Sequence, residues 1–304
     1  MNLLDKKVLV VSHDAGGAEV LSHFIKCELN LEKLTFLLSG PAVDIFHKNL
    51  GVHKNSKTLE MDLKKNEILI TSTSWESDIE YEALKLAVKY QIDTYTMLDH
   101  WVNFKSRLVR NDIEILPNHL IVLDKYAKTL AHETWPNLKI VEKPNYYLID
   151  QQSKYNEKIV TKSSKKCDDS ILYLWDHSLK HKSKLGLVNE ITNNSKFYDE
   201  RDAFSLFISK VATIPGDSSK IRVRFHPSMT KDDKEEACNY IGRSFEISTS
   251  ELIDDLLDCI SVVGCNSMAM AIALSVGKKV FSSLPNSSFS ILLPFEDIVP
   301  LHLI

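Results

Sequence analysis

The chain has 304 residues and a mass of 34.6 kDa, and its 37 Lys and Arg against 41 Asp and Glu give a formal charge of −4. At roughly 150 residues per domain this length favours two domains, and 44% hydrophobic with 26% charged residues is typical of a globular protein rather than a disordered or collagen-like one. The charge balance excludes a general attraction to nucleic acid or anionic lipid, so an anionic ligand needs a local site.

The first half of the chain alternates short strands with helices. Apolar runs rich in β-branched residues predict strands at 7–12, 34–38, 67–71, 94–98 and 119–123. Amphipathic stretches between them predict helices at 20–29, 44–49 and 78–90.

The chain then turns polar and lysine-rich between 151 and 169, which is typical of a linker. Beyond it the alternation resumes, with strands predicted at 170–175, 220–225, 245–247, 259–263 and 279–281, and helices at 198–212, 231–240, 251–257 and 267–276. This pattern predicts an α/β protein with two doubly wound, Rossmann-like domains facing a cleft, at residues 1–150 and 170–304. In such domains ligands bind outside the carboxyl ends of the strands.

The five cysteines are scattered and form no CxxC pair, so neither a disulfide framework nor a zinc site is indicated. The apolar run near the amino terminus is too short for a signal peptide, and no run approaches the roughly 18 apolar residues of a membrane span. We therefore expect a cytoplasmic protein. The lysines at 162–166 are typical of a solvated linker, and docking at the inner membrane surface remains the alternative.

The stretch at 260–281 is the most informative in the chain. A buried strand ends at Gly264, and Asn266 and Ser267 stand at the start of an alanine-rich helix. Free N–H groups and the helix dipole make such a start an anion site. The alternative is an ordinary helix cap made by these two side chains.

A second strand ends in Arg224, Phe225, His226 and Pro227. The proline biases His226 toward an extended backbone at the carboxyl end of this strand. There the imidazole can donate to a phosphate or a base, with Arg224 supplying positive charge, although a lone histidine is more often structural.

These motifs carry a resemblance over residues 221–285. The order strand-His-Pro, acidic helix, then strand-Gly-x-Asn-Ser-helix resembles the carboxyl-terminal domain of GT-B fold glycosyltransferases, and is most similar to bacterial sialyltransferases and Kdo transferases that use CMP-activated sugars. The resemblance implies that His226 and Pro227 contact the cytidine nucleotide and that Asn266 and Ser267 hold its phosphate. Asn266 departs from the hydroxyl residue usual there. The following helix contains no acid to hold a ribose, which favours CMP over UDP or GDP.

His13, Asp14, Gly16 and Gly17 follow the first predicted strand. The glycines allow close backbone approach, and the spacing matches neither a GxGxxG fingerprint nor a phosphate-binding P-loop. The resemblance implies an acidic base on an amino-terminal loop, for which Asp14 is the candidate, with His13 and Glu76 as substitutes. The alternative for Asp14 is that it caps the first helix, and the alternative for Glu76 is that it caps the helix predicted at 78–90.

Asp99 and His100 also follow a predicted strand, so we expect them, with Gly16 and Gly17, to contact the substrate. The ring of Trp175 could stack on a sugar or base, and core packing is the alternative. The sequence contains no GxSxG motif, so a hydrolase triad is not indicated. It also contains no DxD motif, no HExxH motif and no paired cysteines, so a metal site is not indicated. We expect no cofactor and no metal.

The sequence thus predicts an inverting, metal-independent glycosyltransferase that moves a nonulosonic or Kdo-type sugar from a CMP donor to a bacterial surface-glycan or glycolipid acceptor. Two alternatives share the architecture. One is a UDP-sugar hydrolase or 2-epimerase that needs no carbohydrate acceptor. The other is an assembly protein that binds nucleotide without turnover.

Overall fold

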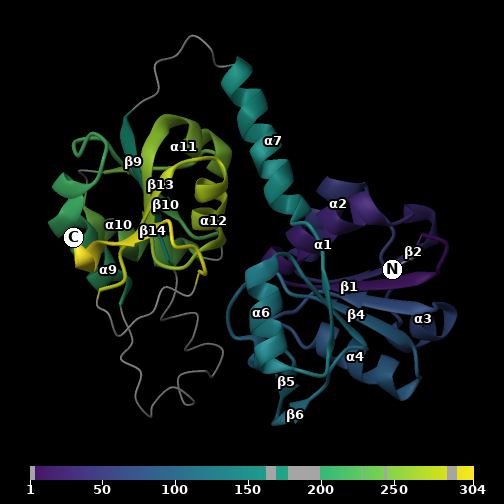
Figure 1. The fold of residues 1–304 in the computed structure, drawn as a ribbon. Coiled ribbons are helices and arrows are strands. Elements are labelled where there is room, and N and C mark those ends of the chain that lie inside the picture. Colours follow the sequence, from purple (N-terminus) through teal and green to yellow (C-terminus); the bar gives the residue numbers. More distant parts are fainter. Residues whose placement is uncertain (1–3, 162–168, 177–198, 228, 243–244, 286–292) are drawn as a thin grey trace. The chain divides into compact units, whose positions relative to one another are not determined.

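The computed structural model describes residues 4–161, 169–176, 199–227, 229–242, 245–285 and 293–304. The chain forms two compact units, Met1–Ile149 (unit 1) and Asp150–Ile304 (unit 2) (Figure 1). Both are α/β units built on a parallel six-stranded sheet, which confirms the predicted pair of Rossmann-like domains.

The sheet of unit 1 has the strand order β2-β1-β3-β4-β7-β8. All neighbours are parallel, and the strands are β1 (Val8–Ser12), β2 (Leu34–Leu38), β3 (Ile68–Thr71), β4 (Asp93–Met97), β7 (His119–Val122) and β8 (Lys139–Glu142). The chain steps from β1 to β2 on one side and then returns to β3 on the other. The carboxyl ends of β1 and β3 therefore meet at the point where the winding direction reverses, which is where open α/β sheets bind ligands.

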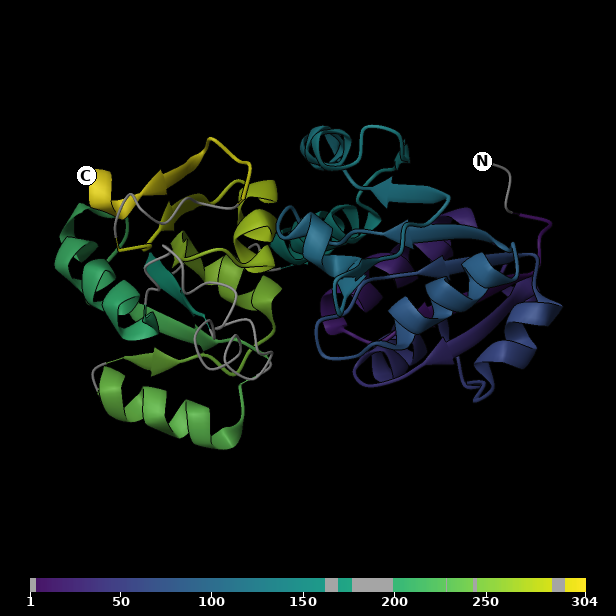
Figure 2. The same ribbon diagram turned by 90° about the horizontal axis from the view of Figure 1, so that it is seen from below.

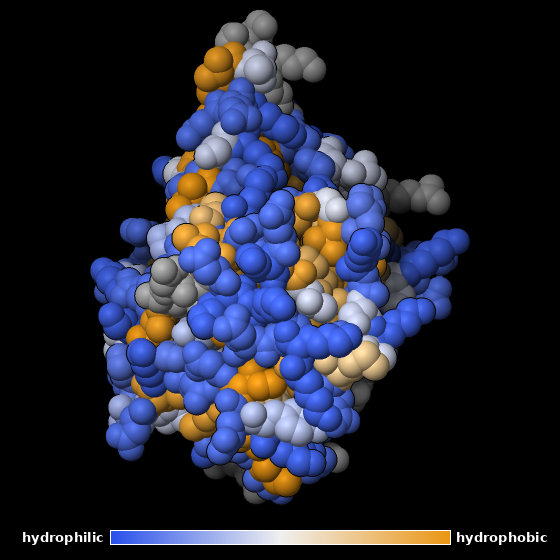
Figure 3. Space-filling view, turned by 90° about the vertical axis from the view of Figure 1, so that its right-hand side faces the viewer, coloured by the Kyte–Doolittle hydropathy of each residue, from blue (hydrophilic) through white to orange (hydrophobic). Residues whose placement is uncertain are grey.

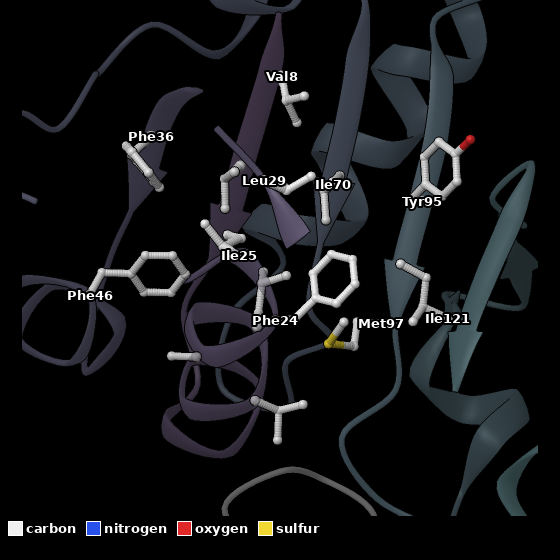
Figure 4. Close-up of a cluster of buried hydrophobic side chains, with 14 of the residues drawn as sticks. Val8, Phe24, Ile25, Leu29, Phe36, Phe46, Ile70, Tyr95, Met97 and Ile121 are labelled. Carbon is white, nitrogen blue, oxygen red and sulfur yellow. The ribbon is translucent and has the colours of Figure 1, made fainter. Parts of the chain in front are cut away.

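Helices cover both faces of this sheet. On one face Phe24 of α1 and Phe46 of α2 pack against Val8 and Ile70, and Figure 4 shows these side chains together. On the other face Leu63 packs with Leu9 and Ala83. The helices are α1 (Ala15–Glu28), α2 (Ala42–Leu50), α3 (Leu59–Lys65), α4 (Ile79–Lys89), α5 (Phe104–Arg107) and α6 (Lys125–Thr134), with a small hairpin of β5 (Val109–Arg110) and β6 (Ile113–Glu114).

The sheet of unit 2 has the order β11-β10-β9-β12-β13-β14, which is the strand order of the Rossmann fold. Its winding direction reverses between β9 and β12. The strands are β9 (Ser170–Trp175), β10 (Ile221–Phe225), β11 (Glu246–Ile247), β12 (Cys259–Gly264), β13 (Lys279–Ser282) and β14 (Ile298–Pro300).

In unit 2 the helices also lie on either side of the sheet (Figures 1 and 2). Residues of α9 (Glu200–Lys210) and α10 (Lys231–Ile241) share one core cluster with β9 and β10. The helices α11 (Leu252–Asp258) and α12 (Met268–Ser275) pack on β9, β12 and β13. Short 3-10 helices span Leu31–Lys33, Val211–Thr213 and Leu301–Leu303.

The predicted linker differs from the structure over residues 151–161, which belong to helix α7 (Tyr146–Thr161). Lysine, glutamate and glutamine are good helix formers, so a polar composition does not exclude a helix. Within unit 2, Gln152 donates to the carbonyl of Ser275 at 2.7 Å and Lys158 pairs with Asp254 at 2.7 Å. The lysine run at 162–166 lies outside the described residues.

The face drawn in Figure 3 is largely hydrophilic, with hydrophobic side chains in small, separate groups. Among the described residues, no helix combines the length and the apolar character needed to cross a bilayer.

Candidate functional site

His13 and Asp14 form a side-chain pair directly after β1. Asp14 occupies the N-cap position of α1, but its side chain makes no capping hydrogen bond. Instead one carboxylate oxygen lies 2.7 Å from Nδ1 of His13, and the other accepts the backbone N–H of Trp75 at 2.7 Å. The carboxylate therefore orients the imidazole and ties the turn after β1 to the loop after β3, so the capping alternative does not hold.

The ring of His13 keeps one nitrogen for further chemistry. Because Nδ1 donates to the Asp14 carboxylate, Nε2 is the nitrogen that can exchange a proton, and it has no hydrogen-bond partner among the described residues. The side chains of His13 and Asp14 are 17% and 19% exposed. A histidine whose ring is held in one orientation by a carboxylate is a suitable general acid or base.

Glu80 of α4 is a buried carboxyl that the sequence analysis missed. Its Oε1 accepts the backbone N–H of His13 at 2.8 Å and the hydroxyls of Ser72 and Ser74 at 3.2 and 2.5 Å. Its Oε2 is buried and has no partner. Burial raises the pKa of Glu80 above its ordinary value, because a charged carboxylate is poorly solvated there.

The sequence does hold a signal for Glu80. Residues 80, 83, 84 and 87 recur at helical spacing, and Ala83, Leu84 and Ala87 are apolar. An acidic residue in line with such a stripe faces the core, where an unpaired charge is costly. Its position therefore indicates a role for the carboxyl group.

The two glycines of the predicted loop lie in the first turn of α1, which begins at Ala15. A Cβ atom added at Gly17 would lie 2.6 Å from Cβ of Ser72, and one at Gly16 would lie 2.6 Å from a carboxylate oxygen of Asp99. These glycines let α1 approach the ends of β3 and β4 closely, bringing His13 and Asp14 to the residues that follow those strands.

Asp99 is held by a buried arginine. Its carboxylate accepts from Nη1 of Arg107 at 2.6 Å, and the same guanidinium donates to Thr73 and lies 5.2 Å from the ring centre of Trp75. Arg107 is 6% exposed, and it was not among the residues predicted from the sequence. His100 follows Asp99 and is half-buried. The structure thus brings Asp99 to the same sheet edge as His13 and Asp14.

A small pocket lies beside this cluster. It is lined by hydroxyl side chains of the β3 end, by Glu80, and by two arginines, Arg107 and Arg110. Arg110 pairs with Asp78 at 2.6 Å and donates to the carbonyl of Ser74. Glu76 is exposed on the same loop, and Asp78, not Glu76, is the N-cap residue of α4, which begins at Ile79.

In unit 2 the predicted nucleotide residues stand at the carboxyl ends of neighbouring strands. His226 and Pro227 follow β10 and are exposed, whereas Asn266 and Ser267 follow β12 and are half-buried. The strand β9 lies between β10 and β12. Ser267 is the N-cap residue of α12, yet its side chain makes no capping bond and its Oγ is buried without a partner.

The end of β12 is closely packed at Gly264. A Cβ atom there would lie 3.2 Å from both the Cβ of Leu174 and the sulfur of Met270. Gly264 thus lets the strand pass directly into the turn that carries Asn266 and Ser267.

Two side chains that were expected to contact the ligand, Arg224 and Trp175, instead contact other residues of unit 2. Arg224 donates to the fully buried carboxylate of Asp255 at 2.9 Å and to the carbonyl of Ser250, and this ion pair neutralises its charge. Trp175 is 6% exposed and packs among aromatic rings, including Phe204 and Phe225. These two expectations are corrected: Arg224 closes an internal ion pair, and Trp175 belongs to the core of unit 2.

Among the described residues, no group of three or more His, Cys, Asp or Glu side chains is arranged to hold a metal ion. No protein-family model matches the sequence, and no curated protein matches it.

The structure is similar to solved UDP-GlcNAc 2-epimerases. The enzyme from Neisseria meningitidis, solved with UDP-GlcNAc bound, superposes with a TM-score of 0.58 at 11% identity, covering 90% of this chain and 82% of that one. The enzyme from Methanocaldococcus jannaschii, in complex with UDP-GlcNAc and UDP, gives a TM-score of 0.57 at 13% identity, over 96% and 88% of the two chains. At such identities the likeness shows a GT-B-like fold.

Proposed function

We propose that the chain is a nucleotide-sugar enzyme of the UDP-N-acetylhexosamine 2-epimerase or hydrolase type, which needs no carbohydrate acceptor. The observation that carries the chemistry is the 2.7 Å contact between Asp14 and His13, at the point where the sheet of unit 1 reverses its winding direction. The likeness to structures solved with UDP-GlcNAc supports the substrate class.

Inverting a sugar carbon that bears a hydrogen requires that one proton leaves the carbon and another reaches its opposite face. We assign removal of the proton to Nε2 of His13, whose ring Asp14 holds in place, and the proton that reaches the opposite face comes from solvent. This reverses the roles expected from the sequence, in which Asp14 was the base. Both carboxylate oxygens of Asp14 are already engaged, by His13 and by the N–H of Trp75.

We assign the nucleotide to the carboxyl edge of the sheet in unit 2. The unpartnered Oγ of Ser267, together with the amino-terminal end of the α12 dipole, is the site that we assign to a diphosphate. His226, at the end of β10, is the second candidate contact with the nucleotide.

A second candidate is the transfer of a CMP-activated sugar to a glycan acceptor. It is favoured by one observation: α12 carries no acidic residue to hold a uridine ribose, and this feature of the sequence resembles CMP-sugar transferases.

The two candidates are separated by a thermal-shift panel of UDP, CMP and GDP. A ligand present at a hundred times its Kd stabilises the native state by roughly 2.7 kcal/mol. We expect UDP to raise the melting temperature most, whereas a larger shift with CMP would favour the second candidate. No shift with any nucleotide would contradict both. Ser267→Ala should reduce the shift, and Ser275→Ala, at the other end of α12, is the matched control.

A further inference from the structure

Glu80 joins the turn after β1 to the loop after β3. Its Oε1 accepts from the N–H of His13, and from Ser72 and Ser74 in the loop that follows β3. The Oγ of Ser74 also accepts the N–H of Asp14 at 3.3 Å. The backbone of both members of the His13–Asp14 pair is thereby fixed, directly or through Ser74, to one buried oxygen.

The other oxygen of Glu80 is placed differently. Oε2 is buried without a partner, and Glu80 as a whole is 4% exposed. The cations that line the adjoining pocket are Arg107 and Arg110, and each is paired with a carboxylate, Asp99 or Asp78. Burying a carboxylate without a cation of its own costs far more free energy than burying a neutral carboxylic acid.

We infer that Glu80 is a positioning residue that acts as a neutral carboxylic acid, with Oε1 fixing the His13–Asp14 pair in its hydrogen-bonded geometry. Burial raises the pKa of Glu80 by more than the hydrogen bonds from Ser74 and His13 lower it, which supports the neutral form. The charged groups that face this carboxyl group are His13 and Asp14 from the turn after β1, Arg107 from α5 and Arg110 from β5. The inference deepens the proposed function, on which it rests only for the task given to His13.

The test uses a spectroscopic signature of the pair rather than activity. A ring N–H of histidine bonded to a carboxylate gives a low-field proton resonance, and loss of this resonance in His13→Gln identifies the one from His13. Glu80→Gln keeps a neutral acceptor oxygen for the three donors, and Glu80→Leu removes it. Glu82→Gln, two residues along the same helix, is the control, because the Glu82 side chain is 50% exposed.

We expect Glu80→Gln and Glu82→Gln to keep the resonance and Glu80→Leu to lose it. Loss in Glu80→Gln, or survival in a folded Glu80→Leu, would overturn the inference. If Glu80→Leu does not fold, Ser74→Ala replaces it, and the resonance should broaden or vanish because Ser74 links Glu80 to Asp14. An unchanged spectrum in Ser74→Ala would contradict us, as would absence of the resonance from the unmodified chain.

A pH series tests the neutral form. The carboxyl ¹³C resonance that is present in the unmodified chain and absent from Glu80→Gln reports this group directly, and we expect it to titrate at a pH above the range of an ordinary glutamate. Titration within the ordinary range would refute a neutral Glu80. A chain without turnover on nucleotide sugars would contradict the proposed function, yet it would leave these spectra interpretable, so the two failures are distinguishable.

Discussion

At the scale of single residues, the most unusual group is a buried carboxyl on a helix. Glu80 is 4% exposed, and its hydrogen bonds reach the turn after β1, 67 residues away in sequence, as well as the nearby loop after β3. A buried acid that is fully bonded on one oxygen and unbonded on the other restricts the geometry around it while destabilising its own charged form.

That destabilisation predicts a pH effect on stability. Because the pKa of Glu80 is raised in the folded chain, its contribution to the free energy of unfolding is fully present below the unfolded pKa. The contribution is lost as the pH rises through the folded pKa. We therefore expect Glu80→Gln to gain stability relative to the unmodified chain as the pH rises, in denaturant titrations. A difference that stays constant with pH would contradict the raised pKa.

The proton transfer that we assign to His13 predicts a kinetic effect. His13→Gln and Asp14→Asn should each lower kcat by roughly 10²-fold or more, because removal of a general acid or base acts on the transition state. The Kd for the nucleotide should stay near that of the unmodified chain, since we assign the nucleotide to unit 2. His23→Gln is the control, because His23 lies further along α1 and its ring bonds the carbonyl of Glu19. A His13→Gln enzyme with unchanged kcat would remove this residue from the mechanism.

At the scale of elements, the first turn of α1 is a place where replacing glycine by alanine should destabilise a helix instead of stabilising it. Alanine normally stabilises a helix relative to glycine by about 0.8–1 kcal/mol. At Gly17 the added Cβ would meet Cβ of Ser72 at 2.6 Å, so the helix or the end of β3 must move. We expect Gly17→Ala to lower the free energy of unfolding by about 1–3 kcal/mol, measured by urea titration. A stabilised variant would contradict the close packing of α1 on β3.

A second element contact joins α1 to the segment that leads into α7. Glu28 accepts from Lys143 at 2.7 Å and from the hydroxyl of Tyr146 at 2.5 Å. These contacts lower the pKa of Glu28 and raise that of Tyr146 to about 12.

The sign of the Glu28 shift predicts an acid-sensitive contact. A lowered pKa means that the stabilisation is present above the unfolded pKa and is lost as the pH falls through the folded pKa. Glu28→Gln should therefore destabilise the chain at pH 7, by roughly 1 kcal/mol for a partly exposed pair, and have little effect in acid. The melting temperatures of the two proteins, measured from pH 7 down into acid, provide the test. A melting temperature of Glu28→Gln that stays equally far below that of the unmodified chain in acid would contradict the ion pair.

The elements show what the sequence could and could not reveal. Strands such as β1 and β9 are continuous apolar runs buried on both faces, so their pattern predicts them well. Helices α3, α5, α6 and α7 and strands β5, β6, β8 and β14 lie outside the predicted elements. The strand β8 consists of exposed and half-buried residues, and β14 has 3 residues, so neither has a clear apolar pattern.

The candidate site was predicted in part, because local sequence patterns show which residues follow strands. His13, Asp14 and Asp99 follow strands, and the topology brings them to one edge of the sheet as expected. Arg224 and Trp175 also lie at or near strand ends, but their partners Asp255 and Phe204 come from distant segments. The residues next to Arg224 and Trp175 in the sequence do not indicate these long-range contacts. The sequence alone therefore does not distinguish a residue in an internal contact from one that binds a ligand.

At the scale of the whole molecule, each unit places its polar groups where its own sheet reverses direction. Unit 1 has the His13–Asp14 pair at the ends of β1 and β3, and unit 2 has Ser267 at the end of β12 beside β9. We propose that proton transfer belongs to unit 1 and nucleotide binding to unit 2, so mutations in unit 1 should change kcat and those in unit 2 should change nucleotide affinity.

The proton transfer assigned to His13 is tested most directly by incubating the chain with UDP-N-acetylglucosamine in D₂O and following C2 of the sugar by NMR. A proton that leaves this carbon and is replaced from solvent puts deuterium at C2. We expect deuterium at that carbon with the unmodified chain and at least about 10²-fold slower incorporation with His13→Gln. No deuterium at C2 with the unmodified chain, or equal rates in the two proteins, would contradict the account.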